Sequence, residues 1–234
     1  MGLAHSPRIV TDRLALCLDA GNSKSDGGGG FGFTWNDISG NGFHGSGNQG
    51  QAISNGYVTF NEAFGDYVSF SNEPDLNGKS FSAGCWYRTT DSSMRLIQNA
   101  STGSFGTKNG FQISITSATS WSNTGITSTN GSYIQVTGVD SSTAIDGNWH
   151  CVCLTFDTFT GKGELYLDGT SLYSNTVSGL IGANLNGAGL ELGRANSNQQ
   201  YLDGDIACAF MYTKALTSEE VQQNFNALRG RFGI

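Results

Sequence analysis

The sequence predicts an all-β fold, a two-sheet antiparallel jelly-roll sandwich that ends in one amphipathic helix. Short runs of β-branched and aromatic residues recur along the chain, and Gly, Asn, Asp or Ser bounds each run. The chain has 34 glycines and 2 prolines, a usage typical of many short strands joined by tight turns. A helical pattern of apolar residues occurs only near the C-terminal end. Together these observations favour a single β-sandwich.

The first two-thirds of the chain is expected to supply seven of the eleven predicted strands. We expect 57–60 and 67–70 to form a strand pair joined by a loop. Residues 117–132 are rich in Ser, Thr, Asn and Gly, so we expect a surface lobe or long loops there, where function tends to reside. The strands predicted in this part cover 14–19, 57–60, 67–70, 81–88, 95–98, 110–115 and 133–136.

The last third of the chain shows the clearest strand pattern. Asp168-Gly169 stands between apolar residues and is a strong hairpin signal, because both residues tolerate positive φ. Cys151 and Cys153 are two residues apart, so they share one face of their strand. The strands predicted here cover 149–156, 164–167, 190–192 and 205–212.

One helix is expected after the last strand. Thr217 and Glu220 have the spacing of a capping box, with Thr217 as the N-cap. Val221, Phe225 and Leu228 follow at spacings of four and three, which places them on one helix face. A glycine at position 230 predicts the helix end.

The charge balance excludes some partners. The net charge is −7 and 13% of the residues are charged, without a basic stripe that would bind nucleic acid phosphates. There is no apolar run of about 18 residues, so we expect no membrane insertion. The first residues lack the basic and apolar regions of a signal peptide.

The five cysteines are expected to be small buried apolar residues. Their number is odd, their spacing does not match a zinc site, and each lies in an apolar strand pattern. Free thiols indicate folding in a reducing cytoplasm.

Three stretches resemble a known family. They are IVTDRLALCLDAGNSKS, WNDISGNGFHG and the C-terminal KALTSEEVQQNFNALRGRFGI, and the strand order before the last one is similar too. The chain resembles laminin-G-like, or concanavalin A-like lectin, jelly rolls, in particular those found in structural proteins of tailed bacteriophages of marine bacteria and cyanobacteria. The resemblance covers 9–234 and implies residues 1–11 as an N-terminal arm before one domain at 12–234.

The resemblance implies a function without catalysis. We expect a virion structural protein, assembled in the host cytoplasm and displayed on the particle surface, as a capsid decoration or a tail or fibre component. Its partners would be other virion proteins. The alternative is a carbohydrate-binding receptor module that recognises host envelope polysaccharide, because this fold carries lectins, hydrolases and structural modules alike.

The resemblance also implies a structural calcium ion. Related proteins often join the early DxSGNG turn to the acidic residue of the late strand, which points to Asp37, Asn41 and Asp205, with Asp19 as a further ligand. Carboxylate and amide oxygens are suitable calcium ligands. The alternative is that Asp37 and Asn41 only make hydrogen bonds within their turn, and that Asp205 is a charged residue at the sheet edge.

Two clusters have the composition of a sugar site, an aromatic ring flanked by amide side chains. The first is Trp121 with Asn123 and Tyr133, and the second is Gln199-Gln200-Tyr201 with Asn196 and Asn198. A sugar face stacks on a ring while amides bond its hydroxyls. The alternative for Trp121 is a role in a small core beneath the loops.

Glycosidase activity is a remote alternative. Retaining hydrolysis needs two carboxyls about 5 Å apart, and closely spaced acids of the Glu-x-Asp-x-x-Glu type do not occur. The three histidines are not accompanied by a Gly-x-Ser-x-Gly motif before a helix. The sequence therefore predicts no catalytic residues.

Overall fold

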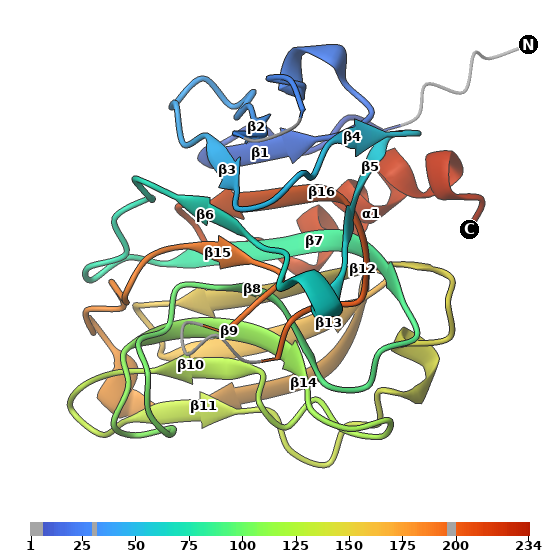
Figure 1. Cartoon of the computed structure of the whole chain (residues 1–234). Coiled ribbons are helices and arrows are strands. Elements are labelled where there is room, and N and C mark those ends of the chain that lie inside the picture. The colour runs from blue at the N-terminus through green and yellow to red at the C-terminus, as the bar shows by residue number, and fades with distance from the viewer. Residues whose placement is uncertain (1–6, 30–31, 196–199) are drawn as a thin grey trace, which may run out of the picture.

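A computed structural model describes residues 7–29, 32–195 and 200–234. These residues form two eight-stranded antiparallel sheets and one α-helix at the C-terminal end (Figure 1). The predicted all-β, two-sheet jelly roll with a C-terminal helix is confirmed. Within the described residues, no helix is both long enough and apolar enough to span a membrane.

The first sheet, called sheet A here, contains the longest strands. Its strands are β1 (Leu14–Asp19), β4 (Ile53–Ser54), β5 (Tyr57–Phe60), β7 (Phe81–Thr89), β12 (Trp149–Asp157), β13 (Lys162–Leu167), β14 (Thr170–Thr176) and β16 (Gly204–Tyr212). They run in the order β14-β13-β12-β7-β16-β5-β4, and β1 pairs with β16. Asp168 and Gly169 both have positive φ, 50° and 78°, and close the predicted hairpin between β13 and β14.

The second sheet, called sheet B here, has shorter strands. They are β2 (Thr34–Trp35), β3 (Gly45–Gly47), β6 (Val68–Phe70), β8 (Met94–Gln98), β9 (Gly110–Ile115), β10 (Gly125–Thr127), β11 (Tyr133–Gln135) and β15 (Glu191–Leu192). They run in the order β11-β10-β9-β8-β15-β6-β3-β2. Short 3-10 helices occupy Ser23–Ser25, Glu62–Phe64, Ser142–Ala144 and Ser178–Leu180.

The main core lies between the sheets. Alternate residues of each strand face it, because successive side chains of a strand point to opposite sides. On β7, for example, Ala83, Cys85 and Tyr87 belong to the inter-sheet core, whereas Trp86 belongs to a second apolar cluster. This second cluster also includes residues of the helix, so it marks the outer face of sheet A.

Helix α1 (Ser218–Phe232) covers the outer face of sheet A (Figure 1). The predicted capping box is present, since the Thr217 side chain accepts from the Glu220 N–H and Glu220 bonds back to the Thr217 N–H. The predicted end at Gly230 is wrong. The helix continues to Phe232 and ends at Gly233, which has φ 76°.

Two strand predictions need correction. Strands β5 and β6 do not pair: β5 pairs with β4 and β16 in sheet A, and β6 pairs with β3 and β15 in sheet B. The 3-10 turn at Glu62–Phe64 and Gly65, with φ 65°, lies between them and carries the chain from one sheet to the other. The polar stretch 117–132 also contains an unpredicted strand, β10, whose Ile126 is fully buried.

All five cysteines, each within the described chain, are free thiols. Cys85, Cys151, Cys153 and Cys208 are buried, as predicted, and Cys17 is half-buried. Cys151 and Cys153 share the face that α1 covers. Burial raises the pKa of the Cys17 thiol to about 12, with the charges of Asp19 and Asp37 adding to the effect.

The described part of the predicted N-terminal arm contacts α1. The Val10 N–H donates to Asn224 Oδ1 at 2.7 Å, and the Val10 carbonyl accepts from the Tyr212 hydroxyl at 2.9 Å. The Arg8 carbonyl accepts from the Gln223 amide at 2.7 Å. The division into an arm at 1–11 and a domain at 12–234 stays a prediction.

Candidate ligand-binding groove

A large groove opens on the outer face of sheet B. Its volume is about 610 Å³. Strands β8, β9 and β11 contribute side chains to it, and so do the loops that follow β8, β9 and β15. We call this cavity the groove. Its lining residues are Arg95, Gln98, Ala100, Ser101, Thr102, Gly103, Ser104, Phe105, Lys108, Gln112, Asn123, Tyr133, Gln135, Ala195 and Gln200.

A row of polar residues crosses sheet B at the base of the groove. Gln98 lies opposite Gln112, and Gly125 lies between Gln112 and Gln135 in the strand register. On the other side, Gln98 lies opposite Glu191. Directly opposed residues of neighbouring strands share one face of a sheet, so these amides form a continuous polar strip.

Arg95 connects three residues of this base. Its Nη1 donates to Gln98 Oε1 at 2.9 Å and to Gln112 Oε1 at 2.6 Å, and its Nη2 donates to Gln200 Oε1 at 2.7 Å. Burial lowers the pKa of Arg95 to about 10, against the opposing effect of the Glu191 charge. The guanidinium therefore ties three glutamines into one rigid network.

Lys108 enters the base from the loop between β8 and β9. Its Nζ donates to Gln112 Oε1 at 2.6 Å and lies 4.2 Å from the centroid of the Phe105 ring. Only 5% of Lys108 is exposed. Burial, and then the charge of Arg95, lower the pKa of Lys108 to about 8. This ammonium group is held at the surface of the cavity with little water around it.

Phe105 and Tyr133 form an aromatic wall beside these charges. Their ring centroids are 5.7 Å apart, and 44% of Tyr133 is exposed. Gly125 makes room for this wall, because a Cβ there would lie 3.0 Å from the Phe105 ring and 2.1 Å from the Ile134 carbonyl oxygen. An exposed ring thus stands next to a buried polar base.

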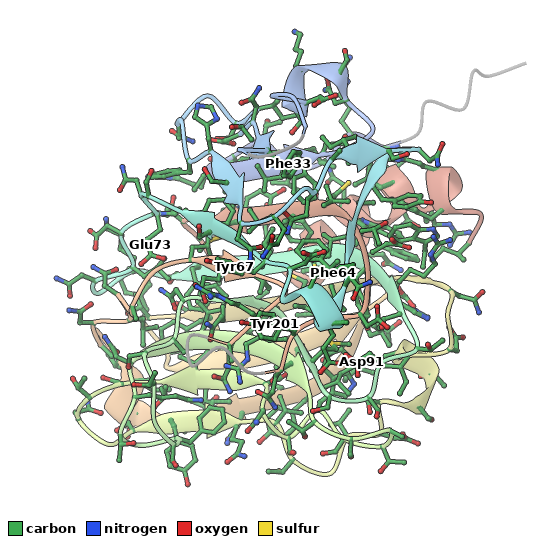
Figure 2. All side chains as sticks on the ribbon, in the orientation of Figure 1. Phe33, Phe64, Tyr67, Glu73, Asp91 and Tyr201 are labelled. Carbon is green, nitrogen blue, oxygen red and sulfur yellow. The ribbon has the colours of Figure 1, made fainter. Side chains whose placement is uncertain are left out.

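The network continues toward β6 beyond the groove. Gln98 Nε2 donates to Glu191 Oε2 at 3.1 Å, and Glu191 Oε1 accepts from Arg194 at 3.0 and 2.5 Å. Arg194 stacks on the Tyr67 ring at 3.3 Å and also bonds Tyr201, whose position relative to Tyr67 is visible in Figure 2. Among the described residues, Glu191 is the only acidic side chain that contacts this network, and Arg194 neutralises its charge.

Apart from Trp121, the structure divides the predicted sugar-binding residues into three groups. Asn123 and Tyr133 both line the groove. Tyr201 lies beside it, on Arg194. Asn196 and Asn198 lie outside the described residues.

Trp121 is the predicted sugar-binding residue that needs correction. It is fully buried and belongs to the inter-sheet core. The ring has no exposed face on which a sugar could stack, so Trp121 serves packing. The polar residues around it in sequence predicted exposure, but the ring packs in the inter-sheet core.

The predicted calcium ligands each have other partners. Asp37 Oδ1 accepts from the N–H groups of Cys17 and Ser39, both at 2.9 Å. Its Oδ2 accepts from the Ser39 hydroxyl at 2.8 Å and from the Phe43 N–H at 3.1 Å. A carboxylate has about four acceptor positions, and those of Asp37 are filled. The Asn41 amide donates to the Leu14 and Ala15 carbonyls.

Asp19 and Asp205 are engaged in ion pairs at different places. Asp19 Oδ1 accepts from Arg231 at 2.5 Å, and Asp205 Oδ2 accepts from Arg88 at 2.6 Å. Within residues 7–29, 32–195 and 200–234, no three His, Cys, Asp or Glu side chains form a group suited to a metal ion. These residues do not fit a shared calcium ion. Calcium binding stays a prediction, which the melting temperature in a chelator tests.

Sequence reasoning missed most of the groove base. Arg95, Gln98, Lys108 and Gln112 were not singled out. The available signal was alternation: in the segment 110–115, Phe111, Ile113 and Ile115 alternate with polar residues. That pattern predicts a polar outer face but does not show which outer face stays open.

Solved structures of toxin binding domains share this fold. The binding domain of Paraclostridial Mosquitocidal Protein 1 has a TM-score of 0.66 and 17% identity, over 93% of this chain and 52% of that one. The binding domain of Botulinum Neurotoxin DC in complex with SialylT has a TM-score of 0.65 and 17% identity, with coverages of 93% and 52%. The same domain in complex with rat synaptotagmin II has a TM-score of 0.62 and 18% identity, over 94% of this chain and 52% of that one.

These similarities show the fold alone, because the identities are low. The chain spans about half the length of the binding domains that it matches. No curated protein matches the chain in sequence.

A family model matches residues 61–222, which is more than half of the chain. The match includes β6 to β16 and the first turn of α1, and so all the strands that line the groove. The chain belongs to the laminin-G-like family of the concanavalin A-like lectin/glucanases superfamily.

Proposed function

We propose that this protein is a non-catalytic binding module of the lectin type that recognises a host surface glycan through the groove. The observation that carries the proposal is the half-exposed Tyr133 ring beside a base of glutamine side chains. The family includes lectins, and the toxin domains that share the fold are binding domains.

The groove has the chemistry that sugars need. A sugar presents a C–H face, which packs on an aromatic ring, and hydroxyl groups, which need donors and acceptors. Gln135 and Asn123 line the groove together with Tyr133, and Gln98, Gln112 and Gln200 are held in place by Arg95. Side chains that are already fixed lose little entropy when a ligand binds.

The lining does not suit glycoside hydrolysis. Hydrolysis by the common mechanisms needs a pair of carboxyl groups across the scissile bond. The described residues that line the groove include no Asp or Glu. We therefore assign binding rather than catalysis to it.

A glycan array compares the wild-type protein with Tyr133→Ala. We expect at least one glycan to bind the wild type, and binding to weaken on the order of tenfold in the variant, because each 1.4 kcal/mol of lost contact is a factor of ten. Phe159→Ala is the matched control, since this ring is 82% exposed and lies outside the groove. An array without hits, or equal binding by the wild type and Tyr133→Ala, contradicts the proposal.

Display on a phage particle is the second proposal. Its support is the sequence resemblance of the N-terminal and C-terminal segments, and it is compatible with glycan binding because a particle can carry a receptor module. Gold-labelled antibody on intact particles of the source phage tests it. Label on the head would favour capsid decoration, label on the tail or fibres would favour a receptor module, and unlabelled particles would contradict the proposal.

A further inference from the structure

The two cations at the base of the groove share one acceptor. Arg95 Nη1 and Lys108 Nζ both donate to Gln112 Oε1 at 2.6 Å. Arg95 is 7% exposed and Lys108 is 5% exposed. Two positively charged side chains with little solvent exposure therefore donate to the same neutral oxygen, Gln112 Oε1.

Neither cation has a counter-ion in the described parts of the chain. By contrast, four other cations each pair with a carboxylate: Arg88, Arg194, Lys214 and Arg231. The segments 1–6, 30–31 and 196–199 contain no Asp or Glu side chain either. Glu191, whose charge acts on Arg95, is bonded to Arg194 and Gln98. The protein as a whole carries a charge of −7, so this base is a positive site within a negative molecule.

Unpaired buried charge is unfavourable, because the low dielectric weakens solvation. The lowered pKa of Lys108, about 8, reflects this cost and the repulsion by Arg95. The Nε of Arg95 is also buried without a partner among the described residues. An anionic ligand would offset both effects and gain charge-assisted hydrogen bonds.

We propose that the groove binds a sugar residue that carries a carboxylate, and that Lys108 and Arg95 supply the positive charge that selects it. This inference rests on the proposed glycan-binding function and names its ligand class, acidic sugars such as uronic or sialic acids. The carboxylate faces Lys108 Nζ, which has donors left after its bond to Gln112. The sugar ring lies against Tyr133, beside Phe105.

Calorimetry on paired probes tests the inference. A panel of uronic-acid and sialic-acid oligosaccharides is titrated, each beside the same oligosaccharide with its carboxylates reduced to hydroxymethyl groups. We expect the wild-type protein to prefer an acidic probe over its reduced counterpart by roughly tenfold or more, the value of a charge-assisted hydrogen bond.

Substitutions assign the preference to the base of the groove. Lys108→Met should reduce it to within about twofold, and Lys108→Arg, which keeps the charge, should retain it. Lys79→Met is the control, because Lys79 is an exposed cation paired with Asp75 outside the groove. Urea unfolding of each variant shows that it is folded, and a preference that survives Lys108→Met in a folded protein overturns the inference.

The outcomes separate this inference from the proposed function. Equal or tighter binding of the reduced probes, weakened by Tyr133→Ala, leaves a lectin but overturns selection for an acid. Sulfated oligosaccharides are titrated in the same way, and tighter binding of these than of the carboxylated probes overturns the assignment of a carboxylate. Binding of none of the probes, together with an array without hits, overturns both.

Discussion

The two outer faces of the sandwich are used in opposite ways. On sheet A, Trp86 stacks on Phe225 and Phe232 of α1, with ring centroids 5.5 and 4.3 Å apart, and the face is sealed by apolar packing. On sheet B, the corresponding face carries Arg95, glutamines and Lys108 around an open cavity. The main core lies between the sheets, so it does not determine whether either outer face is polar or apolar. The comparison indicates that the helix-covered face adds apolar packing to the inter-sheet core, and it leaves the open face to the proposed recognition of a ligand.

The largest effect is expected on the covered face, for Trp86→Ala. Trp86 is fully buried between the sheet and α1. Losing its contacts should lower the free energy of unfolding by about 3–5 kcal/mol. Urea unfolding measures this, and Phe159→Ala, an exposed ring, should change it by less than about 0.5 kcal/mol. Equal losses in the two variants would mean that α1 contributes little to stability.

A pair of glycines compares the two faces directly. A Cβ at Gly84 would lie 2.1 Å from the Val152 carbonyl oxygen and 2.7 Å from Phe210 on the covered face, and one at Gly125 would lie 2.1 Å from the Ile134 oxygen on the open face. Each Gly→Ala change should cost about 1–3 kcal/mol of stability. Only Gly125→Ala should also weaken glycan binding. Weaker binding by a folded Gly84→Ala protein would contradict the separation of roles.

Removal of the helix cap should have a smaller effect. Thr217→Ala deletes the acceptor for the Glu220 N–H and should cost about 1 kcal/mol, as N-cap losses do. The expected result is a lower thermal midpoint with unchanged glycan affinity. Thr217→Ser keeps the acceptor oxygen and is the matched control, so an equal loss in both variants would exclude the cap as the cause.

The smallest effect is a pH dependence from the open face. The pKa of Lys108 is about 8 in the folded protein, below the ordinary value of 10.5. The unfolded chain therefore binds more protons between these values, and stability should rise with pH across that window. The difference in unfolding free energy between the wild type and Lys108→Met isolates this gain. A difference that stays constant from pH 8 to 10 would show that Lys108 is not buried as a cation.

Local patterns predicted most of the strands and the start of the helix, but contacts distant in sequence decided the rest. Thr217 and Glu220 define the helix start by themselves, because both partners of the capping box are adjacent. The helix end was misplaced because Phe232 stacks on Trp86 and Trp149, contacts that carry the helix beyond Gly230. A glycine costs a helix only about 1 kcal/mol, which such stacking offsets.

The groove was only partly predictable for the same reason. Asn123 and Tyr133 were found from composition, since amides beside an aromatic residue are typical of sugar sites. Arg95 and Lys108 were not, because the convergence of their side chains on Gln112 depends on the register of β8 against β9 and on the loop between them. Trp121 misled, because burial depends on the strands that pack over a residue and not on its neighbours in sequence.

The position of α1 also sets how the groove is presented. The C-terminal residue follows α1, which lies on the outer face of sheet A (Figure 1). The groove opens on the outer face of sheet B. Arg231 holds the end of the helix by bonds to Asp19 and the Gly56 carbonyl. A solid support coupled at the C-terminus would therefore sit behind the sandwich and leave the groove facing the solution. The same geometry would orient many copies on a surface with their ligand sites outward.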